Sequence, residues 1–246
     1  MKRLVAAFAL IAVSFGLTPV THALDGEAIL RQVDRNLNPE SYEMYRKLIN
    51  TEPDGSRKEF VLYTAKKGRD SMVALFLAPA SDVGRATLRV DENMWLYIPE
   101  VGKPLRITSL QSVVGGIFNN SDLMRLEFGL EYHVESVAEE KDSYLLGLKA
   151  SSDSVAYDRL KMWVAKAHLL PTKIEAYTAS GMLVKTLRYK NIKDYGGGIV
   201  RPSVMETDSP LYVGYKSTML FADIRPRDFT DEVFSVNYMS RVKELR

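Results

Sequence analysis

The chain has 246 residues, of which 46% are hydrophobic and 26% are charged, so it can form one large core or two small ones. It has no cysteine, which excludes disulfides, a thiol nucleophile, a zinc–thiolate site and lipid attachment to a cysteine. Its formal net charge is +2, from 33 basic and 31 acidic residues.

The first residues have the pattern of a secretory signal peptide. Lys2 and Arg3 precede an apolar run over 4–13, and Thr21-His22-Ala23 supplies small residues for a peptidase. The run is shorter than the roughly 20 residues of a membrane span. We expect cleavage after Ala23, a signal peptide over 1–23 and one exported domain over 24–246, with an uncleaved anchor as the alternative.

Cleavage would also change the charge of the chain. Removing Lys2 and Arg3 from the 33 basic residues leaves 31, which equals the 31 acidic residues. A neutral exported protein is a poor candidate for nucleic acid binding, since that depends on excess positive charge.

A helix is expected over 25–37. Its apolar residues recur at helical spacing, Asp25 can cap its first turn, and Asn38-Pro39 ends it. This is the only confident helix before residue 108.

From Tyr42 onward the apolar period changes to two, which predicts strands. The expected strands are 42–51, 58–65, 72–77, 86–90, 94–98, one starting at 105, 132–137, 143–150, 155–165, 170–177, 183–192, 199–207 and 212–224. No strand–helix–strand alternation occurs, so the sheet should be antiparallel. The apolar residues of the tail over 229–238 should dock on the body.

Two strands, 72–77 and 94–98, are apolar on both faces. Each needs a second cover, which could be a helix, another sheet or a lipid, or it is simply a central strand of a two-layer domain. The segment over 109–128 is too apolar for a free loop. We expect one or two short helices there, the later one capped by Ser121 or Asp122, forming a lid across the sheet.

The sequence offers little for catalysis. His133 and His168 have no second histidine at ligand spacing, so we expect both to be structural, with no metal and no cofactor. The adjacent acids at 91–92, 139–140 and 231–232 fit solvated turns better than an acid/base pair. No nucleophile elbow or phosphate-binding loop occurs. We expect the protein not to be an enzyme, and the alternative is a hydrolase with an unrecognised site.

Four blocks of the chain have a distinctive pattern. They are MVALFLAPASDVGRATLRV over 72–90, DENMWLYIPEVGKPLRI over 91–107, the paired hairpins over 169–208, and 216–239 with its closing Phe-X-X-X-Tyr. These blocks resemble the outer-membrane lipoprotein-sorting family of LolA-like carriers. The likeness covers most of 25–240. Ser121-Asp122 also match the family, but the aromatic and acidic residues that usually follow are replaced by Leu123-Met124-Arg125-Leu126.

The resemblance implies a mainly β (α+β) fold. One large curved antiparallel sheet would form a half-open barrel, with the N-terminal helix and a short helical lid over its concave face. It implies a non-enzymatic, monomeric periplasmic carrier of lipid or lipoprotein acyl chains towards the outer membrane. An inner-membrane exporter of the resistance-nodulation-division type is a possible partner. The alternative is an accessory subunit of such an exporter without lipid cargo.

The ligand-binding candidates are apolar residues of the two doubly apolar strands and of the lid. Core packing is the alternative role for each, because an apolar run does not reveal which face is inside. The predicted cavity residues are Met72, Ala74, Phe76, Trp95, Tyr97, Ile117 and Phe118.

Overall fold

The computed structural model describes residues 25–112 and 114–246. The signal peptide predicted over 1–23 lies outside the described residues. Within the described chain no helix is long and apolar enough to cross a membrane.

Thirteen strands of the described chain form a single sheet, in which every neighbouring pair is antiparallel. The strands are β1 (Ser41–Thr51), β2 (Arg57–Lys67), β3 (Ser71–Ala78), β4 (Ala86–Val90), β5 (Asn93–Tyr97), β6 (Pro104–Ile107), β7 (Tyr132–Glu139), β8 (Ser143–Ala150), β9 (Arg159–Ala165), β10 (Leu170–Tyr177), β11 (Leu183–Asp194), β12 (Val200–Asp208) and β13 (Lys216–Pro226). Their spatial order is β6-β5-β4-β3-β2-β1-β13-β12-β11-β10-β9-β8-β7. The sheet is therefore open, with β6 and β7 at its two ends, which confirms the predicted fold class.

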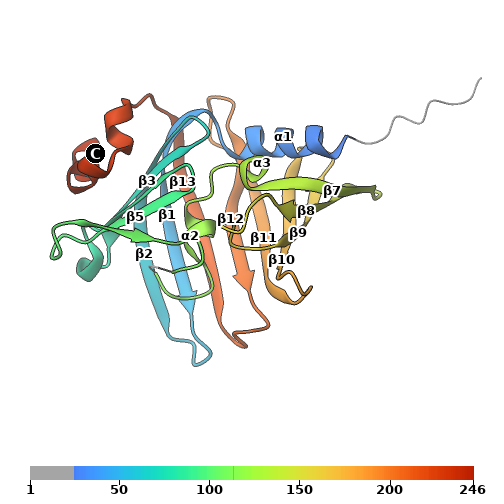
Figure 1. Cartoon of the computed structure of the whole chain (residues 1–246), viewed down its shortest axis with the longest axis horizontal. Helices are drawn as coiled ribbons and strands as arrows, with labels where there is room; N and C mark the ends of the chain where they lie inside the picture. The colour runs from blue at the N-terminus through green and yellow to red at the C-terminus, as the bar shows by residue number, and fades with distance from the viewer. Residues whose placement is uncertain (1–24, 113) are drawn as a thin grey trace, which may run out of the picture.

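Short helices lie on one face of this curved sheet (Figure 1). They are α1 (Gly26–Leu37), α2 (Asn120–Leu123) and α3 (Phe128–Glu131). The predicted cap of α1 is confirmed, because Asp25 Oδ1 accepts a hydrogen bond of 3.0 Å from the amide of Ala28. The cap of α2 was predicted wrongly. Asn119 caps this helix, and Asp122 is its partner in a reciprocal capping box.

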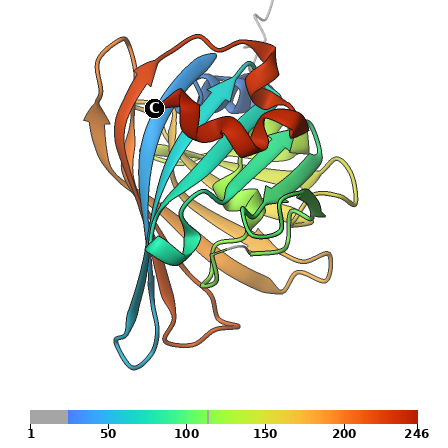
Figure 2. The same ribbon diagram turned by 90° about the vertical axis from the view of Figure 1, so that its left-hand side faces the viewer.

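The opposite, outer face is covered by the C-terminal segment (Figure 2). After β13 the chain forms two 3-10 helices, η2 (Asp231–Phe234) and η3 (Val236–Leu245), whose apolar residues pack on β2, β3 and β4. A third, η1 (Ala80–Asp82), follows β3. The predicted docking of the tail is thus confirmed.

Alternation along β3 divides its apolar residues between two cores. Met72, Ala74 and Phe76 belong to the concave core, which also contains α1. Val73 and Leu75 belong to the outer core beneath the C-terminal segment. The strand is apolar on both faces because each face has its own protein cover.

Two strands start later than predicted. β9 begins at Arg159 and β13 at Lys216, whereas the expected starts were 155 and 212. The residues before each strand form turns, including the hydrogen bonds from the Val155 amide to Ser152 and from the Tyr215 amide to Tyr212. Apolar side chains occur in those turns, so the sequence pattern placed the predicted starts of both strands too early.

Candidate functional site

A small cavity lies between the concave face of the sheet and the residues that cross it. Its volume is about 50 Å³. We call residues 114–131, which include α2 and α3, the cover segment. The apolar wall is rich in methionine and phenylalanine, namely Met44, Met72, Met205, Met219, Phe128 and Phe221. The wall also includes three guanidinium groups, those of Arg46, Arg125 and Arg201.

A second, larger hollow of about 360 Å³ opens at the side where the sheet fails to close. Arg89 and Met94 line it from β4 and β5, while Glu131 and Val155 line it from the other side. This hollow therefore lies between the two ends of the sheet, beside the cover segment.

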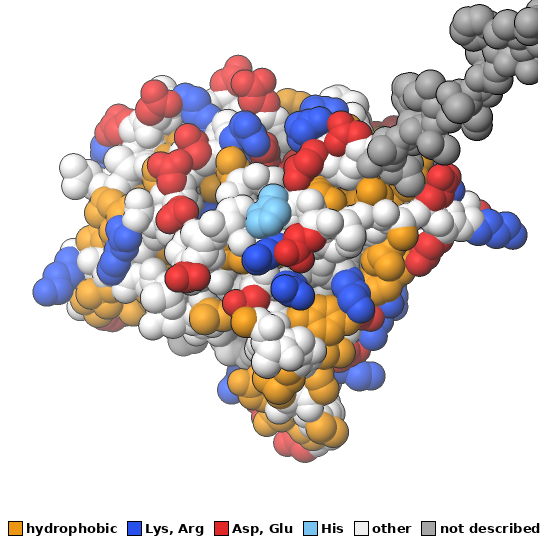
Figure 3. All heavy atoms as spheres, turned by 45° about the vertical axis from the view of Figure 1, so that its right-hand side comes forward, with side chains coloured by type: hydrophobic (Ala, Val, Ile, Leu, Met, Phe, Trp, Pro, Cys, Tyr) orange, Lys and Arg blue, Asp and Glu red, His pale blue; other side chains and the backbone are white. Residues whose placement is uncertain are grey.

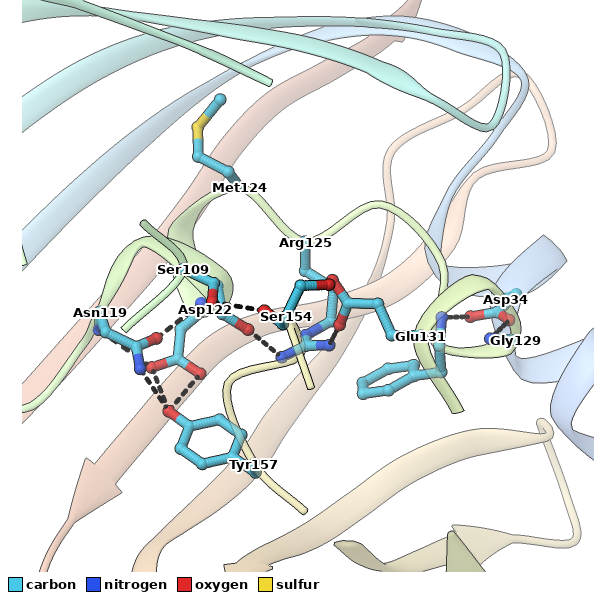
Figure 4. Close-up of polar contacts among 12 residues, drawn as sticks. Asp34, Ser109, Asn119, Asp122, Met124, Arg125, Gly129, Glu131, Ser154 and Tyr157 are labelled. Carbon is cyan, nitrogen blue, oxygen red and sulfur yellow. Dashed lines mark hydrogen bonds and ion pairs between the residues drawn. The ribbon is translucent and has the colours of Figure 1, made fainter. Parts of the chain in front are cut away.

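Glu131 stands between the two hollows. Its Oε1 atom lies 2.6 Å from Nη2 of Arg89, and its Oε2 atom lies 2.5 Å from Nη1 of Arg125. Arg125 lines the small cavity, whereas Arg89 and Glu131 line the larger hollow. Figure 4 shows Arg125 and Glu131 facing each other across this boundary. The buried salt bridge therefore separates the small cavity from the larger hollow by side chains alone.

Asp122 anchors α2 to the sheet. Its Oδ2 atom accepts a hydrogen bond of 2.7 Å from Nζ of Lys185 in β11. On the same helix, Asn119 Nδ2 donates to the hydroxyl of Tyr157 at 2.8 Å (Figure 4). Burial and the nearby Asp122 carboxylate raise the pKa of Tyr157 well above its usual value. Tyr157 therefore stays neutral and holds its place as a hydrogen-bonding group.

Asp34 anchors α3 to α1. Its carboxylate accepts hydrogen bonds from the backbone amides of Phe128 at 2.7 Å and Gly129 at 2.8 Å (Figure 4). Burial raises the pKa of Asp34 to about 6, although these two hydrogen bonds act in the opposite direction.

The start of the cover segment is fixed to the end of β1 and the start of β13. Asn50 Nδ2 donates to the carbonyl of Val114 at 3.0 Å, and Ser217 Oγ accepts the amide of Ile117 at 3.0 Å. Ser217 also donates to Asn50 Oδ1 at 2.7 Å. A Cβ atom at Gly116 would lie 2.3 Å from Asn50 Oδ1, so only glycine allows this close approach.

The centre of the cover segment is held by arginines of the sheet. Arg46 in β1 donates to the carbonyl of Leu123, and Arg89 Nη1 donates to the carbonyl of Met124 at 3.2 Å. These contacts are hydrogen bonds that water can replace when a segment moves, so they hold the cover segment without fixing it irreversibly.

Comparisons with known proteins identify this architecture. A protein-family model described as "Uncharacterized protein" matches residues 68–241, and the chain belongs to that family. A LolA superfamily protein from Nitrosomonas europaea has 28% identical residues and a TM-score of 0.79, covering 88% of this chain and 100% of its own. The fold is that of the LolA superfamily.

Two further solved structures have the same LolA-like fold. A DUF1329 family protein from Desulfovibrio piger has 20% identity and a TM-score of 0.76, covering 86% of this chain and 96% of its own. A protein from Vibrio parahaemolyticus described as an outer membrane lipoprotein-sorting protein domain has 21% identity and a TM-score of 0.73, with 86% and 97% covered. No curated protein matches the chain. The resemblance inferred from the sequence is thus confirmed for the fold.

Within this LolA-like fold, the predicted cavity residues fall into two groups. Met72, Ala74, Phe76 and Phe118 lie in the concave core, and Met72 also lines the small cavity. Ile117 is buried in the cover segment, where its amide and carbonyl are held by side chains of the sheet.

Trp95 and Tyr97 are not brought together with this group. Both are half-buried on the outer face and pack against the outer core. Their neighbours Met94 and Leu96 are the residues of β5 that turn to the concave side, where Met94 joins the concave core.

Sequence reasoning missed the arginines of the LolA-like cavity. Arg46 lies in phase with Met44 and Leu48 on the concave side of β1, where an apolar residue is expected. A charged residue at an inward position was the available signal. Arg201 on β12 gave no comparable signal, because Pro202 and Gly198 obscure the strand period.

Proposed function

We propose that this protein is a non-enzymatic periplasmic carrier that binds lipid, or the acyl chains of lipoproteins, between the concave face and the cover segment. Delivery towards the outer membrane would follow. The observation that supports this most directly is the methionine- and phenylalanine-lined cavity beneath a cover held by hydrogen bonds. The periplasmic location rests on the signal-like pattern of residues 2–23 and on the LolA-like fold.

The carrier needs the cover segment to move. At about 50 Å³ the cavity holds only a few water-sized groups, each of which takes about 10–15 Å³, and an acyl chain needs more. Burial of each methylene contributes about 0.8 kcal/mol, so a chain of ordinary length can offset the loss of several cover hydrogen bonds. Methionines suit such a wall because they repack around different chains.

The proposed ligand contacts are Met72, Ala74, Phe76 and Phe118, with Ile117 at the start of the cover segment. The hollow beside Glu131 is the proposed entrance, because it lies on the open side of the sheet. Displacing the Arg89–Glu131–Arg125 bridge would join it to the cavity.

Native mass spectrometry of the protein purified from the periplasm without detergent, followed by solvent extraction, tests the proposal. We expect a bound species that releases fatty acid, phospholipid or acylated peptide. A clean protein mass, together with no uptake of added lipid, would contradict the carrier function.

One observation favours a second function, that of an accessory subunit of an inner-membrane exporter. The turn between β12 and β13 exposes Leu211, Tyr212, Val213 and Tyr215, with Val213 83% exposed. Apolar side chains gather on the lobe at the lower end of the molecule in Figure 3. Exposed apolar clusters are typical of surfaces that bind partners. Co-purification with an exporter, without lipid and abolished by Val213→Asp, would favour this function.

A further inference from the structure

Two arginines of the small cavity carry charges that the described chain does not neutralise. Arg46 is 3% exposed and Arg201 is 7% exposed, and both line the cavity. No carboxylate of the described residues forms an ion pair with either side chain. Burying a charge without a counter-charge is strongly unfavourable, so the pair requires an explanation.

Part of each guanidinium has a structural role. Arg46 donates to the carbonyl of Leu123, and Arg201 Nη1 donates to the carbonyl of Leu37 at 2.5 Å, where α1 ends. Nε and Nη2 of Arg46 and Nε of Arg201 are nevertheless buried without a hydrogen-bond partner among residues 25–112 and 114–246. The Arg201 guanidinium also lies over the Phe221 ring, 4.9 Å from its centroid. Neither this contact nor the two carbonyls uses the remaining donors.

The other charged groups of the cavity wall are already paired. Among the described residues of this wall Asp122 is the only acid, and it accepts hydrogen bonds from Lys185 and from the Asn119 amide. Arg125 is bound to Glu131 at 2.5 Å. Arg46 and Arg201 are thus the two guanidiniums of this wall that have no carboxylate partner among the described residues.

Both guanidiniums line the same small cavity. Burial lowers the pKa of Arg46 to about 10, the nearby Tyr42 opposes this shift, and the positive charge of Arg201 adds to it. Arg46 still carries its charge at neutral pH. Since one water-sized group takes about 10–15 Å³, the cavity has room for about the four oxygens of a compact oxyanion.

We infer that Arg46 and Arg201 bind the acid group of an anionic lipid, whose hydrocarbon chain lies along the methionine wall. The inference rests on the proposed carrier function and specifies its ligand class. Guanidiniums suit carboxylate and phosphate groups because their planar donors match two oxygens at once. The oxyanion would satisfy the unpartnered donors and neutralise the buried pair.

Oleate and oleyl alcohol test the inference on the unmodified protein, because they share one hydrocarbon chain and differ in charge. Titration calorimetry below the micellar concentrations should give at least about tenfold tighter binding of oleate, as expected for charge-assisted hydrogen bonds. Inorganic phosphate, titrated separately, distinguishes a free oxyanion from one carried by a lipid.

In the variant Arg46→Met/Arg201→Met the preference for oleate over oleyl alcohol should fall to less than about threefold. The variant should fold, since methionine has a similar length and removes the cost of burying an unpaired charge at each position. Loss of the Arg46–Leu123 hydrogen bond changes the cover for both ligands alike. Arg188→Met/Arg241→Met removes two exposed charges and should keep the preference.

Equal binding of oleate and oleyl alcohol by the unmodified protein would overturn the inference and leave the carrier function intact. A preference for oleate that survives in the double variant would overturn the assignment to Arg46 and Arg201. Failure of both lipids to bind would overturn the carrier function and the inference together. If phosphate binds and neither lipid does, the bound oxyanion is free phosphate and not the acid group of a lipid, which would overturn the inference.

Discussion

The ammonium group of Lys185 in β11 lies 2.7 Å from Oδ2 of Asp122 in α2, and both side chains are almost completely excluded from solvent. The pair joins the cover segment to the sheet across a separation of 63 residues. Its burial makes each charge dependent on the other.

Removing the second partner of this pair should cost less stability than removing the first. Lys185→Met or Asp122→Asn should lower the free energy of unfolding by about 3–5 kcal/mol, because a buried charge is left alone. The double variant should lose less than the sum of the single losses. Urea unfolding of the four proteins measures this coupling.

The pair between Lys190 and Glu206 is a matched control, since it has the same 2.7 Å separation but is exposed. Lys190→Met should change the free energy of unfolding by less than about 1 kcal/mol. Simple additivity of the Asp122 and Lys185 changes would contradict the predicted coupling.

Asp34 should make stability depend on pH in an unusual direction. Because burial raises its pKa from 3.8 to about 6, the folded state binds more protons than the unfolded state between these values. The contribution of Asp34 to the free energy of unfolding is therefore fully present below pH 4 and falls through pH 6, by about 3 kcal/mol in order of magnitude.

Asp34→Asn removes this titration, so the stability of the unmodified protein relative to the variant should decline as pH rises from 4 to 7. Chemical denaturation of both proteins at several pH values measures the difference. A difference that stays constant over this range would show that Asp34 has an ordinary pKa in the folded protein.

Substitutions of two adjacent glycines at the start of the cover segment distinguish the cost of backbone strain from the cost of a steric clash. Gly115 and Gly116 both have positive φ, of 66° and 70°. A Cβ atom at Gly115 meets nothing within 4 Å, whereas one at Gly116 would collide with Asn50. Gly115→Ala should cost about 1–2 kcal/mol from backbone conformation alone, and Gly116→Ala about 1–3 kcal/mol more.

Thermal and urea unfolding of these two variants test the contact. The larger loss at Gly116 should be accompanied by faster lipid uptake, because the displaced Asn50 no longer holds Val114. Equal losses at the two positions would mean that the cover adjusts freely around Asn50.

Substitutions of neighbouring residues on β3 test which face of the sheet contacts the ligand. Met72 lines the small cavity, while Val73 is buried in the outer core. Met72→Ala should lower the free energy of unfolding by about 2–5 kcal/mol, yet increase lipid binding by enlarging the cavity. Val73→Ala should destabilise the protein and leave lipid binding unchanged. Native mass spectrometry with added lipid measures both, and equal effects on binding would contradict the assignment of faces.

Local signals were enough to predict much of the fold. Asp25 and the helical spacing after it predicted α1 because a helix end depends on neighbouring residues. The strands followed from their period of two. The apolar tail could be expected to dock because its exposure would be costly.

Other features depended on contacts between distant residues. The sequence does not reveal that Trp95 and Tyr97 face outward, since β5 is apolar on both sides and its register with β4 decides the face. Asn119 caps α2 in a box with Asp122, and Asp122 also binds Lys185 in β11, a contact that nothing near 121 in the sequence signals. The unpaired charges of Arg46 and Arg201 appear only when the strands that carry them are assembled around one cavity.

The strand that comes first along the chain pairs with the one that comes last, since Arg46 in β1 lies opposite Phe221 in β13. During synthesis β1 can pair with β2 early, but its other edge has to wait for almost the whole chain to emerge. Such distant pairing slows folding, and an unpaired edge in the meantime invites association with other chains. A chain that ends before β13 would therefore expose the middle of its sheet as an edge, so aggregation is its expected fate.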